Sequence, residues 1–227
     1  IIIRDCDVVR SFAHKPFNVQ AEKMILARGE IMSTNLVQLY HEENNIPSVL
    51  LNSLEFMFVD GDGEPVMTKI ESELKKVLQR YPDTTLFITQ GFICTNNKGE
   101  VDNLKRGGSD YSASLIGAAI NADVVEIWTD IDGIHNNDPR IVKNTHPIAE
   151  MSFDEAAELA YFGAKILHPS TVLPAKVKNI PVLLKNTMEP HAKGTTISNK
   201  VTGTGIKAIA AKDGLTAIKI DRKSTRL

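Results

Sequence analysis

The sequence predicts a three-layer α/β fold, in which a mostly parallel central sheet carries helices on both faces. Helix and strand signals alternate along most of the chain. Residues 85–128 read as strand, loop, helix and strand, a unit for which a right-handed parallel crossover is expected. The 227 residues are 42% hydrophobic and 24% charged, which is typical of an ordinary globular core. We therefore expect one large domain, or one domain with part of a second.

Composition argues against several classes of protein. A formal net charge of -2 leaves no basic footprint for nucleic acid or for a membrane surface. No apolar run approaches the roughly 20 residues of a membrane span, and the opening isoleucines are interrupted by Arg4 and Asp5, unlike a signal peptide. Cys6 and Cys94 are expected to be reduced thiols of a cytoplasmic protein, and no Cys/His spacing fits zinc.

In the first third of the chain, residues 21–43 are predicted to form a long helix, and residues 47–51 a buried strand. Residues 59–63 resemble the start of a GxGxxG motif, but the third glycine is missing, so we expect a loop. A second helix is indicated by apolar residues at the spacing of one helix face: Ile70, Leu74, Val77, Leu78 and Tyr81. Pro82 is expected to end it.

The central unit begins with a predicted strand at residues 85–89. A long loop is expected from Gly91 to Gly108, with a turn at residues 96–99. Loops of this length inside an α/β unit are usually functional or mobile. Residues 109–121 are then predicted to be a helix and residues 124–128 a strand.

In the last part, Ser152 and Glu155 have the spacing of a capping box that begins a helix. Gly163 is expected to interrupt that helix near its end. A further helix is predicted at residues 170–178, and a buried strand at residues 180–184.

Ligands of open α/β sheets bind outside the carboxyl ends of the strands. The loops after Thr89, Trp128 and Leu184 are therefore the predicted binding loops. Trp128 itself is expected to be a core residue at the end of its strand. No motif or neighbouring charge would activate the Cys94 thiol, so it receives no catalytic role.

Residues 104–110 are the most informative stretch. Two consecutive glycines bring backbone N–H groups close to whatever lies in front of the following helix, where Ser109 is a good N-cap candidate. Arg106 is suited to bind a carboxylate or phosphate with two hydrogen bonds, and Asp110 places one carboxylate in the same cradle. A carboxylate among phosphate-binding groups suggests phosphoryl-transfer chemistry.

Several motifs occur in a fixed order over residues 21–200. They are RGGSDYSA at 106–113, TDIDGI at 129–134, DPR at 138–140 and FGAKILHP at 162–169, with GEIMST at 29–34, TQGF at 89–92, IPV at 180–182, NT at 186–187 and GT at 194–195. Together they closely resemble aspartate kinases, a branch of the amino acid kinase family. No Walker-A pattern is present, which is consistent with that family.

The resemblance implies that ATP, with Mg²⁺, phosphorylates the side-chain carboxylate of L-aspartate to 4-phospho-L-aspartate. This is the first step of lysine, threonine and methionine biosynthesis. It also implies a cytoplasmic enzyme that is a homo-oligomer in its full-length form and binds neither nucleic acid nor membrane. The sequence itself predicts no metal ligands.

The resemblance also implies roles for individual residues. Glu30 and Thr34 would bind the substrate, with Glu30 accepting its ammonium group, and Arg106 would pair with its α-carboxylate. Ser109 and Asp110 would lie at the transfer site and be catalytic.

A second set of residues is implied to bind the nucleotide: Thr129, Asp130, His135, Asp138, Arg140 and Lys165. His135 stands where a tyrosine often lies near the base, and could stack on adenine. Lys165 would approach the phosphates or the adenine side.

Simpler readings remain open for these residues. Asp110 could only stabilise a helix dipole, Glu30 could be a surface carboxylate, and Arg106 a solvated loop cation. Lys165 could be the C-terminal partner of a helix. Residues 138–140 could be a turn with a salt bridge.

The chain also departs from the family pattern. The family's N-terminal Lys-Phe-Gly-Gly-Thr segment, whose lysine contacts the transferring phosphate, is not found before residue 21, so this chain alone is expected to have little or no activity. Lys105 replaces a glycine. Residues 1–200 are expected to be the catalytic domain. Residues 201–227 are expected to be the linker and first strand of a truncated regulatory ACT domain.

Two alternative functions stay open at this point. One is another amino acid kinase with a different carboxylate or phosphate acceptor. The other is a catalytically inactive, nucleotide-binding fragment.

Overall fold

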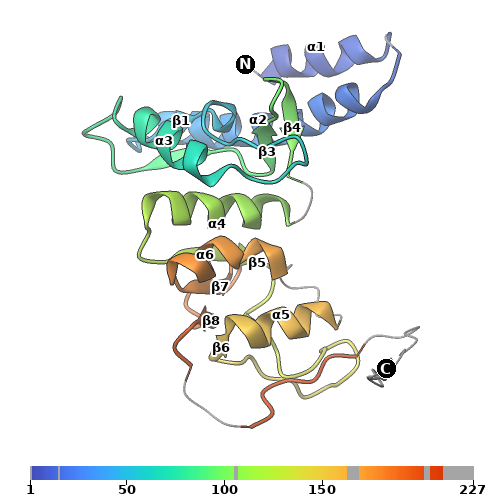
Figure 1. Ribbon diagram of the computed structural model, residues 1–227, viewed down its shortest axis with the longest axis vertical. Helices are drawn as coiled ribbons and strands as arrows, with labels where there is room; N and C mark the ends of the chain where they lie inside the picture. The colour runs from blue at the N-terminus through green and yellow to red at the C-terminus, as the bar shows by residue number, and fades with distance from the viewer. Residues whose placement is uncertain (1, 15, 105–106, 163–168, 202–204, 212–227) are drawn as a thin grey trace, which may run out of the picture.

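The computed structural model describes residues 2–14, 16–104, 107–162, 169–201 and 205–211. It confirms the α/β class: helices and short strands alternate from α1 to β8. The elements form two groups stacked along the long axis of the molecule, with helix α4 lying between them (Figure 1).

The first group holds the elements that precede α4 in sequence. They are α1 (Ile2–Phe12), α2 (Val19–Glu43), β1 (Val49–Leu51), the 3₁₀ helix η1 (Ser53–Glu55), α3 (Met67–Leu78), β2 (Phe87–Thr89), β3 (Ile93–Thr95) and β4 (Val101–Asn103). Strands β1 and β2 pair in parallel, and β3 and β4 form an antiparallel hairpin.

The second group follows α4 (Gly108–Ile120). It consists of β5 (Val125–Thr129), β6 (Glu150–Ser152), α5 (Phe153–Tyr161), the 3₁₀ helix η2 (Pro169–Thr171), α6 (Leu173–Lys178), β7 (Val182–Asn186) and β8 (Thr195–Ser198). Their strands form one sheet in the order β5-β7-β8-β6, parallel except between β7 and β8. Parallel pairing therefore predominates, although the parallel pairs are divided between two sheets.

Each group has its own apolar core. In the first, Ile70, Leu74 and Val77 of α3 are buried, as their helical spacing predicted. In the second, alternate residues of β5 and β7 are buried, including Ile127 and Leu184, which is the period of a strand with one covered face.

Helix α4 joins the two cores. Leu115 belongs to the first apolar cluster, while Ala113 packs against the second. Small residues allow the close approach: a Cβ added at Gly117 would lie 2.5 Å from Val125 Cγ2. The helix that carries the predicted transfer site is thus held from both sides.

The prediction of one long loop from Gly91 to Gly108 is wrong in part. This stretch contains the β3/β4 hairpin, with the predicted turn at residues 96–99 joining the strands. Two three-residue strands are too short for a periodic pattern to be read, and each is stabilised by its pairing with the other.

Other local predictions were also corrected. The helix predicted at residues 170–178 is divided into η2 and α6, and a proline stands in the first turn of α6. Trp128 is not a core residue: its side chain is 45% exposed, because it alternates with the buried Ile127 along β5. The capping box of Ser152 and Glu155 is confirmed in both of its hydrogen bonds.

Gly163 lies outside the described residues, as do residues 202–204 and 212–227 of the predicted linker and regulatory strand. The domain division at residue 200 remains a prediction. Within the described ranges, every helix is too short or too polar to cross a lipid bilayer.

Candidate active site

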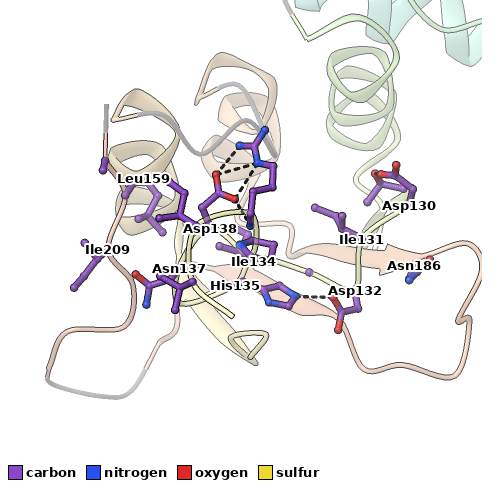
Figure 2. A pocket seen from close by; sticks show the side chains of 18 of the residues that line it. Asp130, Ile131, Asp132, Ile134, His135, Asn137, Asp138, Leu159, Asn186 and Ile209 are labelled. Carbon is purple, nitrogen blue, oxygen red and sulfur yellow. Dashed lines mark hydrogen bonds and ion pairs between the residues drawn. The ribbon is translucent and has the colours of Figure 1, made fainter. Parts of the chain in front are cut away.

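A cavity of about 810 Å³ opens beyond the carboxyl end of β5. Residues 129–135 and 137–142 form most of its lining, and Leu159, Asn186, Glu189 and residues 209–211 complete it. Figure 2 shows Asp130 and Asn186 on one side of this cavity, and Asn137, Leu159 and Ile209 on the other. Because β5 and β7 are parallel and end here, this is the edge at which ligands of α/β sheets bind.

The loop after β5 is held by a buried hydroxyl. Thr195 Oγ1 on β8 accepts a hydrogen bond from the Ile134 N–H at 2.8 Å and donates one to the Ile148 carbonyl at 2.6 Å. Gly133, at φ +121°, passes so close that a Cβ there would lie 2.4 Å from the same hydroxyl. Only glycine fits this conformation and this spacing, so the cavity floor has a defined backbone.

Asp138 and Arg140 form an ion pair on the cavity wall. Asp138 Oδ1 accepts from both the backbone N–H and Nε of Arg140 at 2.9 Å. These hydrogen bonds lower the pKa of Asp138 to about 2. Residues 138–140 therefore form a turn with a salt bridge, as the simpler interpretation predicted, and the same turn also lines the cavity. Arg140 remains largely exposed, so its guanidinium can also meet a ligand.

His135 is oriented from both ring nitrogens. Nε2 lies 2.6 Å from Asp132 Oδ1, and Nδ1 lies 2.8 Å from Thr145 Oγ1 (Figure 2). A ring fixed in this way presents a constant face to the cavity. Thr129 Oγ1 donates to Asp130 Oδ1 at 3.1 Å, which orients the carboxylate next to the end of β5.

The described members of the predicted substrate and transfer residues lie on α2 and in the first turn of α4, outside this cavity lining. Glu30 and Thr34 lie one helical turn apart on α2, and Thr34 Oγ1 donates to the Glu30 carbonyl at 2.9 Å. Asp110 lies in the first turn of α4. Burial raises the pKa of both Glu30 and Asp110, so each carboxylate is partly withdrawn from water.

The turn after β2 contacts both α2 and the start of α4. The side-chain amide of Gln90 donates to Thr34 Oγ1 at 3.0 Å, and a Cβ added at Gly91 would lie 2.8 Å from Ser109 Cβ. Phe92 adopts φ +64°, a strained conformation for a bulky residue, and its N–H donates to Ser112 Oγ at 2.8 Å. The sequence marked Gln90 only as part of a family motif.

The start of α4 differs from the prediction for Ser109. The N-cap is Gly107, at φ +76°, and no side chain caps the helix. A Cβ at Gly107 would lie 1.7 Å from Thr171 Cγ2, so the absence of a side chain lets η2 pack against this turn. Ser109 lies inside the first turn and is exposed. The Ser109 hydroxyl therefore does not cap α4, contrary to the prediction.

Arg106 and Lys165, which the resemblance assigns to the site, lie outside the described residues, as does Lys105. Among the residues that are described, no group of three or more His, Cys, Asp and Glu side chains could hold a metal ion. Burial raises the pKa of the Cys94 thiol to about 12, which agrees with its having no catalytic role.

Several lining residues were not predicted individually. Asn186 and Glu189 follow β7, in a loop that the strand-end rule did indicate. Leu159 and residues 209–211 carry no motif, and their place in the cavity depends on how distant segments pack.

The fold defines an α/β protein with a cavity at the carboxyl ends of parallel strands, and acidic, guanidinium and imidazole groups line this cavity. Residues 4–186 match the amino acid kinase family. The chain belongs to that family.

Similar proteins are aspartokinases. The lysine-sensitive aspartokinase 3 of Escherichia coli K12 is 42% identical over 181 residues, which cover 78% of this chain and 40% of that protein. The crystal structure of E. coli aspartokinase III in complex with aspartate and ADP has a TM-score of 0.80 at 36% identity, over 88% of this chain and 46% of that one.

The aspartate kinase of Clostridium acetobutylicum also has a TM-score of 0.80, at 30% identity over 92% of this chain and 47% of that structure. The chain thus spans less than half the length of these relatives.

Proposed function

We propose that the protein is an aspartate kinase, which transfers the γ-phosphoryl group of ATP to the side-chain carboxylate of L-aspartate. The product would be 4-phospho-L-aspartate, at the start of lysine, threonine and methionine synthesis. A relative of the same fold binds aspartate and ADP, and the motifs shared with such relatives extend over most of this chain.

One observation carries the proposal. Thr129, Asp130, His135, Asp138 and Arg140 were assigned to the nucleotide from sequence motifs alone, and all of them line a single cavity. That cavity lies at the edge of the sheet where α/β proteins bind nucleotides. Its volume of about 810 Å³ is in the range of cavities that hold molecules of this size.

The residues provide the functions that phosphoryl transfer needs. The reaction depends on the alignment of its reactants and on compensation of the phosphate charge, more than on covalent catalysis. In this proposal Arg140 meets the phosphates, and Thr129 and Asp130 orient the nucleotide. Mg²⁺ would enter with ATP, and the carboxylates of Asp130 and Asp132 are of the ligand type that it prefers.

The amino-acid substrate would lie between α2 and α4. Glu30 accepts its ammonium group, and partial burial strengthens this pairing because the local dielectric constant is low. Asp110 and Ser109 lie at the transfer site, and Arg106 pairs with the α-carboxylate. Lys165 acts on the nucleotide. Cytoplasmic location and assembly into a homo-oligomer remain part of the proposal.

An acceptor panel tests this function. Acyl phosphate is captured as a hydroxamate, with ATP and either L-aspartate, L-glutamate or N-acetylglutamate as the acceptor. UMP phosphorylation is followed separately, by release of ADP. In a full-length version of the protein, turnover is expected with aspartate and with none of the other acceptors, whereas this chain alone is expected to show little or none. Preferential turnover of another acceptor would contradict the assignment, and nucleotide binding without any turnover would favour an inactive nucleotide-binding protein. The relatives above, at 30–42% identity, favour the aspartate kinase.

A further inference from the structure

The segment 205–211, which follows β8, closes one side of the candidate nucleotide cavity. Residues 209–211 line this cavity together with the loop after β5. The Ile209 N–H donates to the Asn136 carbonyl at 2.9 Å, so the segment is tied to that loop by its backbone. Figure 2 shows Ile209 on the same side of the cavity as Asn137 of the loop and Leu159 of α5, across from Asp130.

An ion pair anchors the same segment to α5. Lys207 Nζ lies 2.9 Å from Glu155 Oε2, and the lysine side chain is mostly buried. The same carboxylate accepts from the Ser152 N–H at 2.7 Å in the capping box. Burial raises the pKa of Glu155, but the hydrogen bonds from Ser152 and Lys207 outweigh it and leave the pKa lowered. The segment is therefore attached on both sides of Ala208.

Leu159 and Ile209 provide apolar surface on the side of the cavity that also carries Asn137. Asp130 and Asp132 lie toward the end of β5, whereas Leu159 and Ile209 lie on the opposite side. Ile209 is 62% exposed, although it is apolar and lines a cavity. The two faces of a purine base are apolar and flat, and they gain free energy by covering such a side chain.

We propose that Ile209 forms the apolar wall against which the base of the nucleotide packs. Lys207 and Glu155 are positioning residues that hold this wall in place. The inference rests on the proposed function, because it requires a purine nucleotide in this cavity. It assigns the segment after β8 to the binding site, in addition to the loop after β5.

The first test uses Ile209→Ala, with Ile206→Ala as its matched control. Ile206 belongs to the same segment and is 87% exposed, but it does not line this cavity. It also does not line a second, smaller cavity that lies between the segment and α5. In calorimetry with Mg·ATP, Ile209→Ala is expected to raise the Kd about fivefold or more, as for truncation of an apolar contact. Ile206→Ala should leave the Kd unchanged.

A ligand without a base shows which part of the nucleotide is involved. Ile209→Ala should leave the affinity for Mg·tripolyphosphate unchanged, because that ligand has phosphates only. Equal weakening for both ligands would contradict a base contact, and so would a wild-type Kd for ATP.

The second test removes the anchor. Glu155→Gln keeps an acceptor for the capping box but loses the charge, and Lys207→Met removes the ammonium group. Each variant is expected to raise the Kd for ATP about fivefold and, in a full-length version of the protein, to raise the KM for ATP equally while the KM for aspartate stays unchanged. The double variant should bind ATP no more weakly than either single variant. Additive effects, or equal shifts in both KM values, would overturn the positioning role.

The two levels of inference fail in different ways. A wild-type chain that binds no purine nucleotide would overturn the proposed function together with this inference. Wild-type binding that Ile209→Ala does not alter would overturn the inference alone.

Discussion

The side-chain amide of Gln90 donates a hydrogen bond to Thr34 Oγ1 at 3.0 Å. Gln90 is buried, and its Oε1 accepts from the Ser53 N–H at 2.9 Å. One amide thus joins the end of β2 to α2 and to η1. It holds the hydroxyl proposed to bind the substrate, next to the turn that contacts the start of α4.

We expect Gln90→Leu to destabilise the fold and weaken substrate binding. The buried Ser53 N–H would lose its partner, which costs about 1–3 kcal/mol of the free energy of unfolding. Urea unfolding measures this loss. In steady-state kinetics on a full-length version, the KM for aspartate should rise relative to wild type more than the KM for ATP does. The exposed Gln79 at the end of α3 is the control, and Gln79→Leu should change stability by less than about 0.5 kcal/mol.

Glu30→Ala should affect the amino acid far more than the nucleotide. The variant removes the proposed partner of the substrate ammonium, and loss of one member of a buried charge pair costs on the order of 2–5 kcal/mol. In a full-length version of the protein, the KM for aspartate is therefore expected to rise strongly while the KM for ATP changes little. Glu22→Ala, an exposed carboxylate on the same helix, is the control. Equal effects on both substrates would refute the role of Glu30.

Asp110→Asn is expected to separate stability from activity. Burial raises the pKa of Asp110, so the charged form is disfavoured in the folded state. Folding stability from this group is present at low pH and falls as the pH rises from the unfolded pKa through the folded pKa. The asparagine variant should lose this pH dependence and melt higher at neutral pH, as followed by calorimetric Tm. In a full-length version of the protein, the kcat of this variant should fall about 10²–10³-fold.

A rise in stability with an unchanged kcat would show that Asp110 serves only the fold. A loss of kcat with no gain in Tm at neutral pH would show that the cost of burying its charge is small.

Arg140→Ala should weaken nucleotide binding. A hydrogen bond to a charged group contributes about 1.5–3 kcal/mol, so the Kd for Mg·ATP is expected to rise about tenfold or more. Since the pKa of Asp138 lies at about 2, the Asp138 carboxylate keeps its charge at mildly acidic pH, and the pair should not produce pH dependence there. Calorimetry at several pH values measures both effects. Arg80→Ala, which removes an exposed guanidinium from the first group of elements, should leave the Kd unaltered.

Gly107→Ala should destabilise the protein more than Gly99→Ala. Both glycines have a positive φ, of +76° and +80°, so both substitutions carry a similar backbone strain of about 1–2 kcal/mol. Only at Gly107 would the new Cβ collide with a neighbour, Thr171 Cγ2 at 1.7 Å. Chemical denaturation compares the two variants. Similar losses of stability would mean that η2 can move away from the start of α4.

Local patterns in the sequence determined several features correctly. The buried face of α3, with Ile70, Leu74 and Val77, follows from helical spacing. The capping box of Ser152 and Glu155 is read from residues three apart. The loop after Trp128 was recognised from its motif and its place at a strand end, and it lines the cavity as expected. All of these depend on residues that are neighbours along the chain.

The sequence by itself therefore determined the fold class, the order of the main elements and the loop that forms the largest part of the cavity. Only the tertiary structure decided that residues 91–108 contain a hairpin, that Trp128 is exposed, that Gln90 binds Thr34, and that Ile209 meets the loop after β5. Periodicity and capping are encoded locally, whereas these contacts join segments far apart along the chain. Their free energy depends on the packing of the whole fold, so no short stretch of sequence reveals them.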